Sequence, residues 1–389
     1  MTPPKYSTAI VDLPRSGIRR IYDQASQYPD CIRLEVGEPG FGTPAHIKAA
    51  AERAMAEGFT RYTPNAGIRD LREALVTKLH TRNGILADPD DVIVTSGAVA
   101  SVFSTLASLV DPGDEVLVSD PSWPNYVQMA LLLGAVPVHY PLRLEHDLVP
   151  TVDDIERSIT PASKVLIVNS PGNPSGAVTP EHRLRDILEL AREHDLWVIS
   201  DEVYDEIYFD APPPSMFPLD TDGRVVSVFS FSKTYAMTGW RVGYLVGAPE
   251  LVGHVLRAQE PITSCVNSIA QMAAVEAIRG DQTCVAEMRA SYAANAVASC
   301  ALLDDAGVPY SRPSGAFYLM VDISGSGLSD IDFCSRMIEE RRVAVVPGSA
   351  FGPASGRYAR VSLASPLDDL RVGLERVADA VVTWSPSAR

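Results

Sequence analysis

Lys233 stands in a stretch whose other side chains are mostly apolar or carry hydroxyl groups, SFSKTYAMTGWRVGY at residues 230–244. An amine in such surroundings loses hydration, which lowers its pKa and prepares it to form a Schiff base with a carbonyl compound. A loop lysine that happens to precede a strand would give the same pattern. Arg241, eight positions later, is a second cation of this stretch.

Three further polar side chains follow predicted strands at the point where each strand ends. Asp201 and Tyr204 follow the run WVIS, and Asn173 lies in the turn after KVLIVN. The sequence SGA at 96–98 opens a helix after VIVT, and Lys233 follows VVSVFS. Taken singly, Asp201 could be a helix cap, Asn173 a turn residue and SGA a plain helix start. Together they predict one site, because ligands of open α/β sheets bind beyond the carboxyl ends of the strands.

The elements that would position these residues indicate an α/β fold. Between about residues 90 and 250, short β-rich runs alternate with helical patterns, such as those at 98–110 and 181–194. The runs are mostly apolar, which is typical of strands covered by helices on both faces. The predicted strands are 92–95, 115–119, 136–140, 164–169, 197–200, 225–230 and 243–247.

A second, smaller α/β pattern follows long helical segments at 267–304. Segment 1–40 is irregular, and we expect it to pack with this C-terminal part. The predicted elements of the smaller pattern are strands within 315–323, 342–347 and 357–364 and helices at 330–341 and 366–383.

Composition and charge argue against several classes of protein. A net charge of −16 and a pI near 4.9 make nucleic acid a poor partner. The five cysteines are irregularly spaced and form no Cys-x-x-Cys pair, and the histidines form no His-Glu-x-x-His motif, so neither a disulfide framework nor a metal is expected. The sequence has no apolar run of about 18 residues and no secretion signal, so we expect no membrane span and a cytoplasmic location.

Eight motifs along the chain resemble those of fold type I pyridoxal-phosphate enzymes, in the class I/II aminotransferase family of the aspartate aminotransferase superfamily. The lysine stretch and the Asn-Pro-x-Gly turn are the most specific of them. The motifs are LEVGEPGFGTP (34–44), RYTPNAGIRDLREAL (61–75), VTSGA (94–98), DPSWPNY (120–126), NSPGNPSG (169–176), SDEVYDEIYF (200–209), SFSKTYAMTGWRVGY (230–244) and RYARVSLA (357–364).

The resemblance implies an α/β fold with a large domain, built on a seven-stranded, mostly parallel sheet, and a small α/β domain. The expected divisions are an N-terminal segment, 1–45, that packs with the small domain, a large pyridoxal-phosphate-binding domain, 46–290, and a small C-terminal domain, 291–389. The resemblance also implies a homodimer with a shared active site, because Tyr62 matches a tyrosine that reaches the cofactor phosphate of the neighbouring subunit.

Catalytic roles fall by resemblance on Lys233, Asp201 and Tyr204. Lys233 would bind pyridoxal 5'-phosphate covalently and then carry the proton during the reaction. Asp201 would keep the pyridine nitrogen protonated, so that the ring withdraws electrons. Tyr204 and Asn173 would donate hydrogen bonds to the phenolic oxygen of the cofactor.

The other implied roles concern the phosphate, the ring face and the substrate. A helix N-terminus, serine hydroxyls and Arg241 would bind the phosphate. Trp123 would cover the ring. Arg360 would hold the substrate α-carboxylate together with Gly37 and Asn173. The alternation of residues along its strand does not decide which side of the sheet Arg360 faces. The predicted cofactor-binding set is Gly97, Ala98, Val99, Trp123, Asn173, Asp201, Tyr204, Ser230, Ser232, Lys233, Arg241 and Tyr62.

The predicted activity is transfer of an amino group between an L-α-amino acid and a 2-oxo acid. Segment 98–110 carries no Lys or Arg that could bind a second carboxylate, which favours neutral or aromatic over acidic substrates. Arg15, Arg19 or Arg20 could supply such a cation, or could form a solvated basic stretch. The alternative function is a lyase or synthase of the same fold that acts by β- or γ-elimination or substitution, or that resembles aminocyclopropane-carboxylate synthase. This alternative stays open because such an enzyme would use every cofactor residue named above.

Overall fold

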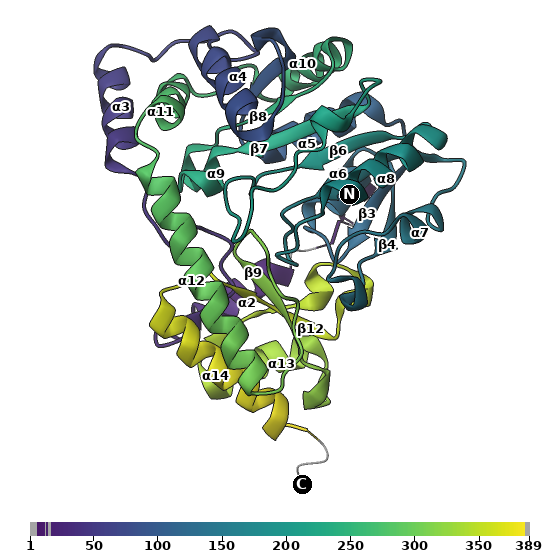
Figure 1. The fold of residues 1–389 in the computed structure, drawn as a ribbon, viewed down its shortest axis with the longest axis vertical. Coiled ribbons are helices and arrows are strands. Elements are labelled where there is room, and N and C mark those ends of the chain that lie inside the picture. Colours follow the sequence, from purple (N-terminus) through teal and green to yellow (C-terminus); the bar gives the residue numbers. More distant parts are fainter. Residues whose placement is uncertain (1–5, 12, 15–16, 386–389) are drawn as a thin grey trace, which may run out of the picture.

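A seven-stranded sheet forms the centre of the larger part of the structure, a computed structural model that describes residues 6–11, 13–14 and 17–385 (Figure 1). Strand β8 is antiparallel to both of its neighbours, and every other neighbouring pair is parallel. In spatial order the strands are β2 (Val92–Thr95), β8 (Gly243–Val246), β7 (Val225–Ser230), β6 (Trp197–Asp201), β5 (Ser163–Asn169), β3 (Glu115–Asp120) and β4 (Val136–Pro141). The predicted seven-stranded, mostly parallel sheet is confirmed, with each strand within one residue of its predicted ends.

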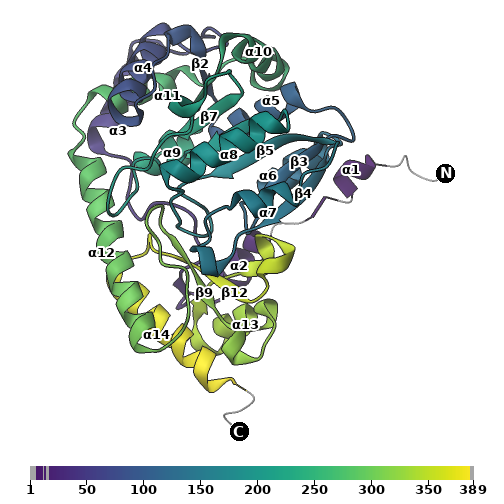
Figure 2. The ribbon, with the colours of Figure 1, turned by 45° about the vertical axis from the view of Figure 1, so that its right-hand side comes forward.

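Helices cover both faces of this sheet, which explains why its strands are mostly apolar. Along β3, Val116 and Val118 pack with one layer of helices, whereas Leu117 between them packs with another. The first layer consists of α5 (Ala98–Leu109), α6 (Asn125–Leu132) and α10 (Pro249–Thr263). The opposite face is covered by α7 (Val152–Glu156) and α8 (Glu181–Glu193) and, toward β2, by α3 (Ala45–Ala56), α4 (Arg69–Asn83) and α11 (Ser268–Arg279) (Figure 2).

A smaller antiparallel sheet lies in the other part of the structure, in the order β11 (Val346–Pro347), β12 (Tyr358–Ser362) and β9 (Tyr318–Asp322). The N-terminal segment joins this part, because β1 (Ile32–Arg33) pairs with β10 (Val343–Ala344). Ile21 and Leu34 belong to the same buried cluster as residues of the smaller sheet and of the helices that pack on it. The accompanying helices are α2 (Gly17–Ala25), α13 (Asp330–Arg336), which continues as one π-helical turn over Met337–Arg341, and α14 (Leu367–Thr383).

Helix α12 (Thr283–Asp305) runs from the larger sheet to the smaller one and packs beside α14 (Figure 1). The expected division between residues 290 and 291 therefore falls within a continuous helix. The domain boundaries stay a prediction.

The topology brings the ends of β5, β6 and β7 together. Asn169, the last residue of β5, is paired with Asp201, the last residue of β6. β7 ends beside them at Ser230, where the short helix α9 (Phe231–Thr234) begins. Helix α1 (Thr8–Val11) completes the fold, and no helix among the described residues is long and apolar enough to cross a membrane.

Candidate active site

A cavity of about 470 Å³ opens between the carboxyl ends of these strands and the smaller sheet. Most of the residues predicted from the sequence line it. They are Gly37, Ala98, Val99, Trp123, Asn173, Asp201, Tyr204, Ser230, Ser232, Lys233, Arg241 and Arg360. The structure therefore brings together side chains that are spread over more than three hundred positions of the sequence.

Lys233 lies inside the cavity because α9 starts directly after β7, with the Ser230 hydroxyl capping the helix by accepting a hydrogen bond from the Ser232 backbone N–H at 3.1 Å. The Lys233 Nζ donates to the carbonyl oxygen of Gly37 at 2.7 Å. The rings of Tyr204 and Phe317 lie 6.0 and 5.7 Å from the same nitrogen. Burial lowers the pKa of Lys233 to about 8, as its apolar sequence neighbourhood suggested.

Asp201 is buried at the end of β6. Its Oδ2 accepts a hydrogen bond of 2.5 Å from the Tyr126 hydroxyl, and its Oδ1 accepts one of 3.3 Å from the Val203 backbone N–H. Burial raises the pKa of Asp201 to about 6, and the bond from Tyr126 acts in the opposite direction. The carboxylate is thus held in place and poorly hydrated, which suits it to pairing with a cation.

Tyr126 received no role from the sequence, although it lies in the DPSWPNY motif. It follows Trp123 by three positions, and the two rings meet edge to face at 5.3 Å in the cavity wall. This spacing was the available signal, since residues three apart at a helix start share a face. Nothing in the sequence indicated that its hydroxyl would reach Asp201, 75 positions away.

Two further lining residues, Tyr318 and Asn169, were also missed. The hydroxyl of Tyr318, from β9, lies 3.1 Å from the hydroxyl of Tyr204. Asn169 holds the turn that carries Asn173, because its side chain donates to the Asp201 carbonyl at 2.9 Å and accepts from the Asn173 backbone N–H at 2.8 Å.

Arg360 faces the cavity, which answers the question that strand alternation left open. Its guanidinium donates to Asn173 Oδ1 at 3.1 Å and to the Glu35 carbonyl at 2.6 Å. The rings of Tyr318 and Phe351 lie 4.5 and 4.8 Å from its central carbon. Its Nε is buried and has no hydrogen-bond partner among the described residues. Such a buried, partly bonded cation is suited to bind an anion.

Arg241 lies at the N-terminus of α5, where Gly97 is the N-cap residue with φ of 79°. This φ favours glycine at position 97, and a side chain there would also displace the guanidinium of Arg241. Gly97 does not itself line the cavity, but Ala98 and Val99 do. The helix N-terminus, Arg241 and the hydroxyl-bearing Ser230 and Ser232 form a group of donors that fits an anion such as a phosphate.

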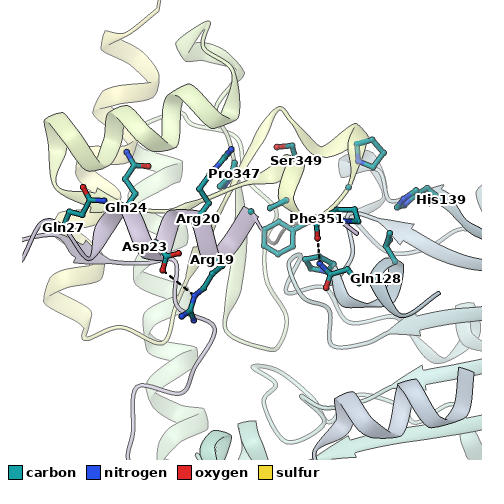
Figure 3. A pocket seen from close by; sticks show the side chains of 17 residues that line it. Arg19, Arg20, Asp23, Gln24, Gln27, Gln128, His139, Pro347, Ser349 and Phe351 are labelled. Atoms are coloured by element: carbon teal, nitrogen blue, oxygen red, sulfur yellow. Dashed lines mark hydrogen bonds and ion pairs between the residues drawn. The ribbon is translucent and has the colours of Figure 1, made fainter. Parts of the chain in front are cut away.

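Tyr62 is 92% exposed and does not line the cavity of its own chain. Arg19 and Arg20 do not line it either, although Ile18 beside them does. Both arginines border a separate cavity of about 1080 Å³ between α2 and α6, in which they project in different directions and Arg19 forms an ion pair with Asp23 (Figure 3). Arg15 lies outside the described residues. Within the described part, no group of three or more His, Cys, Asp or Glu side chains could hold a metal ion.

The fold and this cavity define an α/β enzyme with a desolvated lysine, a buried carboxylate and two arginines in one cavity. The chain belongs to the family of class I and II aminotransferases, whose family model matches residues 29–377. It is therefore an aminotransferase, a transferase that acts on amino acids and keto acids, as predicted.

Relatives and solved structures agree with this family. The chain is 38% identical to aromatic-amino-acid aminotransferase 2 of Thermococcus litoralis over 93% of this chain and 94% of the relative. It is 38% identical to the aspartate/prephenate aminotransferase of Thermus thermophilus, with 90% of each chain covered. The structure of Thermus thermophilus aspartate aminotransferase with maleate superimposes with a TM-score of 0.93 at 35% identity, covering 97% of this chain and all of that one. The predicted fold type I architecture is confirmed, and these relatives give no support to the lyase or synthase alternative.

Proposed function

We propose that the protein binds pyridoxal 5'-phosphate at Lys233 and moves the amino group of a neutral or aromatic L-α-amino acid to a 2-oxo acid. The observation that carries this proposal is the position of the desolvated Lys233 Nζ in one cavity with Asp201, Arg241 and Arg360. When bound, the cofactor supplies an aldehyde that takes up the amino group and a pyridinium ring that accepts the electrons left at Cα.

The residues that line the cavity fit the cofactor at four points. The N-terminus of α5 and Arg241, with Ser230 and Ser232, would bind the phosphate. Asp201, fixed by Tyr126, would pair with the protonated ring nitrogen. Asn173 and Tyr204 would donate to the phenolic oxygen, and Trp123 would cover a ring face.

The substrate would be bound and deprotonated by Arg360 and Lys233. Arg360 has a planar fork of donors that matches a carboxylate, and it lines the cavity. Because burial lowers the pKa of Lys233 to about 8, a share of its Nζ is neutral near that pH and can take the proton from Cα. The apolar side chains of Ile18, Val99 and Trp123 in the cavity lining would limit the access of water.

Substrate choice follows from how the cations of the cavity are used. Its described lining contains three cations, Lys233, Arg241 and Arg360, and each has a role above. No further lysine or arginine of the described lining is left for a second carboxylate, and Ile18 and Val99 are apolar. These observations support neutral or aromatic side chains over acidic ones.

We also propose that the enzyme works as a cytoplasmic homodimer. Tyr62 is 92% exposed in the single chain, which suits a residue that completes the phosphate site of the other subunit. Five free cysteines fit a reducing compartment.

A half-reaction tests the proposal. Cofactor-loaded enzyme is mixed with one L-amino acid and no 2-oxo acid, and the released oxo acid and pyridoxamine phosphate are quantified. We expect one equivalent of each per active site, formed faster from phenylalanine or leucine than from aspartate. Faster reaction with aspartate would refute the substrate class. Release of pyruvate from an S-substituted donor, with no amino acid giving pyridoxamine phosphate, would refute transamination.

A further inference from the structure

Segment 201–206 alternates between the cavity and the protein interior. Asp201 and Tyr204 line the cavity, whereas the acidic residues that follow them, Glu202 and Asp205, are buried away from it. The Glu202 carboxylate accepts hydrogen bonds from serine hydroxyls of β6 and β7, at 2.8 and 2.7 Å. Glu202 therefore ties the start of the segment to the sheet.

The second tie is an ion pair between Asp205 and Lys78 of α4, both of whose side chains are at least nine-tenths buried. Asn83, at the end of the same helix, accepts from Lys78 Nζ at 2.8 Å and donates to Asp205 Oδ2 at 3.1 Å. The ring of Phe229, in β7, lies 4.9 Å from Lys78 Nζ. The pair is thus enclosed on one side by the helix and on another by the sheet.

The backbone next to the pair leads directly to Tyr204. The Asp205 N–H donates to the Glu202 carbonyl at 3.0 Å, and the Ile207 N–H donates to the Tyr204 carbonyl at 2.8 Å. Beyond the pair, Glu206 lies 3.9 Å from Arg82 of α4 and 3.7 Å from Arg289 of α12. A shift of Asp205 would therefore move the Tyr204 backbone, and with it the hydroxyl in the cavity.

A buried ion pair is a poor source of stability, because removing two charges from water costs about as much as their attraction returns. Well-packed apolar residues often replace such a pair without loss of stability. Such a pair can instead serve to hold the chain in one position.

We propose that Lys78 and Asp205 form a positioning pair that fixes the Tyr204 hydroxyl at the cofactor's phenolic oxygen. This inference rests on the proposed function, in which Tyr204 donates a hydrogen bond to that oxygen. The donated bond stabilises the negative charge of the oxygen and lowers its attraction for the proton on the neighbouring lysine–cofactor linkage. A displaced Tyr204 raises the pH at which that proton leaves.

The experiment is a pH titration of the visible absorption of the enzyme loaded with pyridoxal 5'-phosphate, without substrate. The reference is Tyr204→Phe, which should raise the midpoint by roughly one pH unit, the equivalent of one lost hydrogen bond. The test variant is the double substitution Lys78→Met with Asp205→Leu, which removes both charges. We expect it to keep its melting temperature within a few degrees and to raise the midpoint by part of the Tyr204→Phe shift.

Combining the double substitution with Tyr204→Phe completes a mutant cycle. In this combined variant we expect no shift of the midpoint beyond that of Tyr204→Phe alone. Asp205→Asn is the second test variant if the double substitution does not fold, and it should shift the midpoint in the same direction. Asp154→Asn is the matched control, because Asp154 is a buried carboxylate paired with Arg143 and Arg157 outside the cavity. It should change the melting temperature only.

The outcomes separate the two levels of the proposal. A shifted Tyr204→Phe midpoint with an unchanged midpoint in the Lys78 and Asp205 variants would show that the pair is structural only. A shift in those variants that persists in full in the Tyr204→Phe background would show that the pair does not act through Tyr204. An unchanged midpoint in Tyr204→Phe itself would overturn the proposed contact of Tyr204, and the positioning role with it.

Discussion

The Lys233 Nζ donates a hydrogen bond to the carbonyl oxygen of Gly37, which lies 196 positions earlier in the chain. Two residues before Gly37, the carbonyl oxygen of Glu35 accepts from Arg360 at 2.6 Å. One short N-terminal segment thus contacts both the lysine proposed to bind the cofactor and the arginine proposed to bind the substrate.

The amine of Lys233 should react with the cofactor at a lower pH than an ordinary lysine. Only the neutral amine attacks an aldehyde, and burial lowers the pKa of Lys233 to about 8 from an ordinary value of 10.5. The rate of pyridoxal 5'-phosphate capture by the cofactor-free protein should therefore rise with pH, reach half its maximum near pH 8 and then level off. Stopped-flow absorbance measures it, with Lys233→Ala as the control. A rate still climbing above pH 10 would contradict the desolvated state.

Asp201→Asn should cut turnover by several orders of magnitude without lowering stability. Burial raises the pKa of Asp201 to about 6, so at pH 8 the folded protein holds a carboxylate that would be better hydrated in the unfolded chain. The amide removes that cost together with the charge that would keep the ring nitrogen protonated. Thermal unfolding of the cofactor-free proteins at pH 8 and single-turnover rates measure the two effects. Near-normal turnover would make Asp201 a structural residue.

Tyr126→Phe should weaken cofactor binding, because it frees the Asp201 carboxylate from its hydroxyl partner. The loss of a hydrogen bond to a charged group corresponds to about 1.5 kcal/mol, or roughly tenfold in the dissociation constant. Tyr140→Phe is the control, since the Tyr140 hydroxyl is also buried but donates to the Ile167 carbonyl. Equal effects of the two variants on cofactor affinity would remove the special role of Tyr126.

Arg360→Lys should raise the KM for the amino donor by about tenfold or more and leave the cofactor spectrum unchanged. Lysine keeps the charge but lacks the fork that binds a carboxylate with two parallel bonds. Arg357→Lys is the control, because Arg357 lies just before the same strand and pairs with Asp322. If Arg360→Lys retained the parental KM, another residue would have to bind the substrate carboxylate.

Tyr62→Ala should weaken cofactor binding in the subunit opposite to the one that carries it. Loss of the Tyr62 hydroxyl should raise the dissociation constant of the cofactor by roughly fivefold, as expected for one hydrogen bond of about 1 kcal/mol. In a heterodimer of Tyr62→Ala with Lys233→Ala, the single intact lysine would lie opposite an intact Tyr62, and its site should regain the parental affinity. Affinity as weak as in the Tyr62→Ala homodimer would place Tyr62 in its own subunit's site.

The fold could be predicted because its main strands are buried on both faces and therefore stand out as apolar runs. The positions of Asp201, Asn173 and Lys233 followed from the same runs, since Asp201 is the last residue of its strand and the other two follow strand ends closely. Smaller strands were less distinct. The run 342–347 contains two short strands, β10 and β11, which pair with strands of two different sheets.

Residues whose role depends on a distant partner could not be predicted. Tyr126 is an aromatic residue at a helix start until Asp201 comes within reach of its hydroxyl. Lys78 looks like a polar residue on an amphipathic helix, and only Asp205, 127 positions later, makes it a buried cation. The side that Arg360 faces is likewise decided by Asn173 and Glu35. Pairings of this kind are set by tertiary packing, which local patterns do not contain.

The most direct test of the account is the identity of the lysine that binds the cofactor. The protein loaded with pyridoxal 5'-phosphate is treated with borohydride, digested and mapped by mass spectrometry. We predict one phosphopyridoxyl group per chain, on Lys233 Nζ, and none in Lys233→Ala. Modification of another lysine, such as the buried Lys78 or the exposed Lys48, with Lys233 left free, would contradict the account.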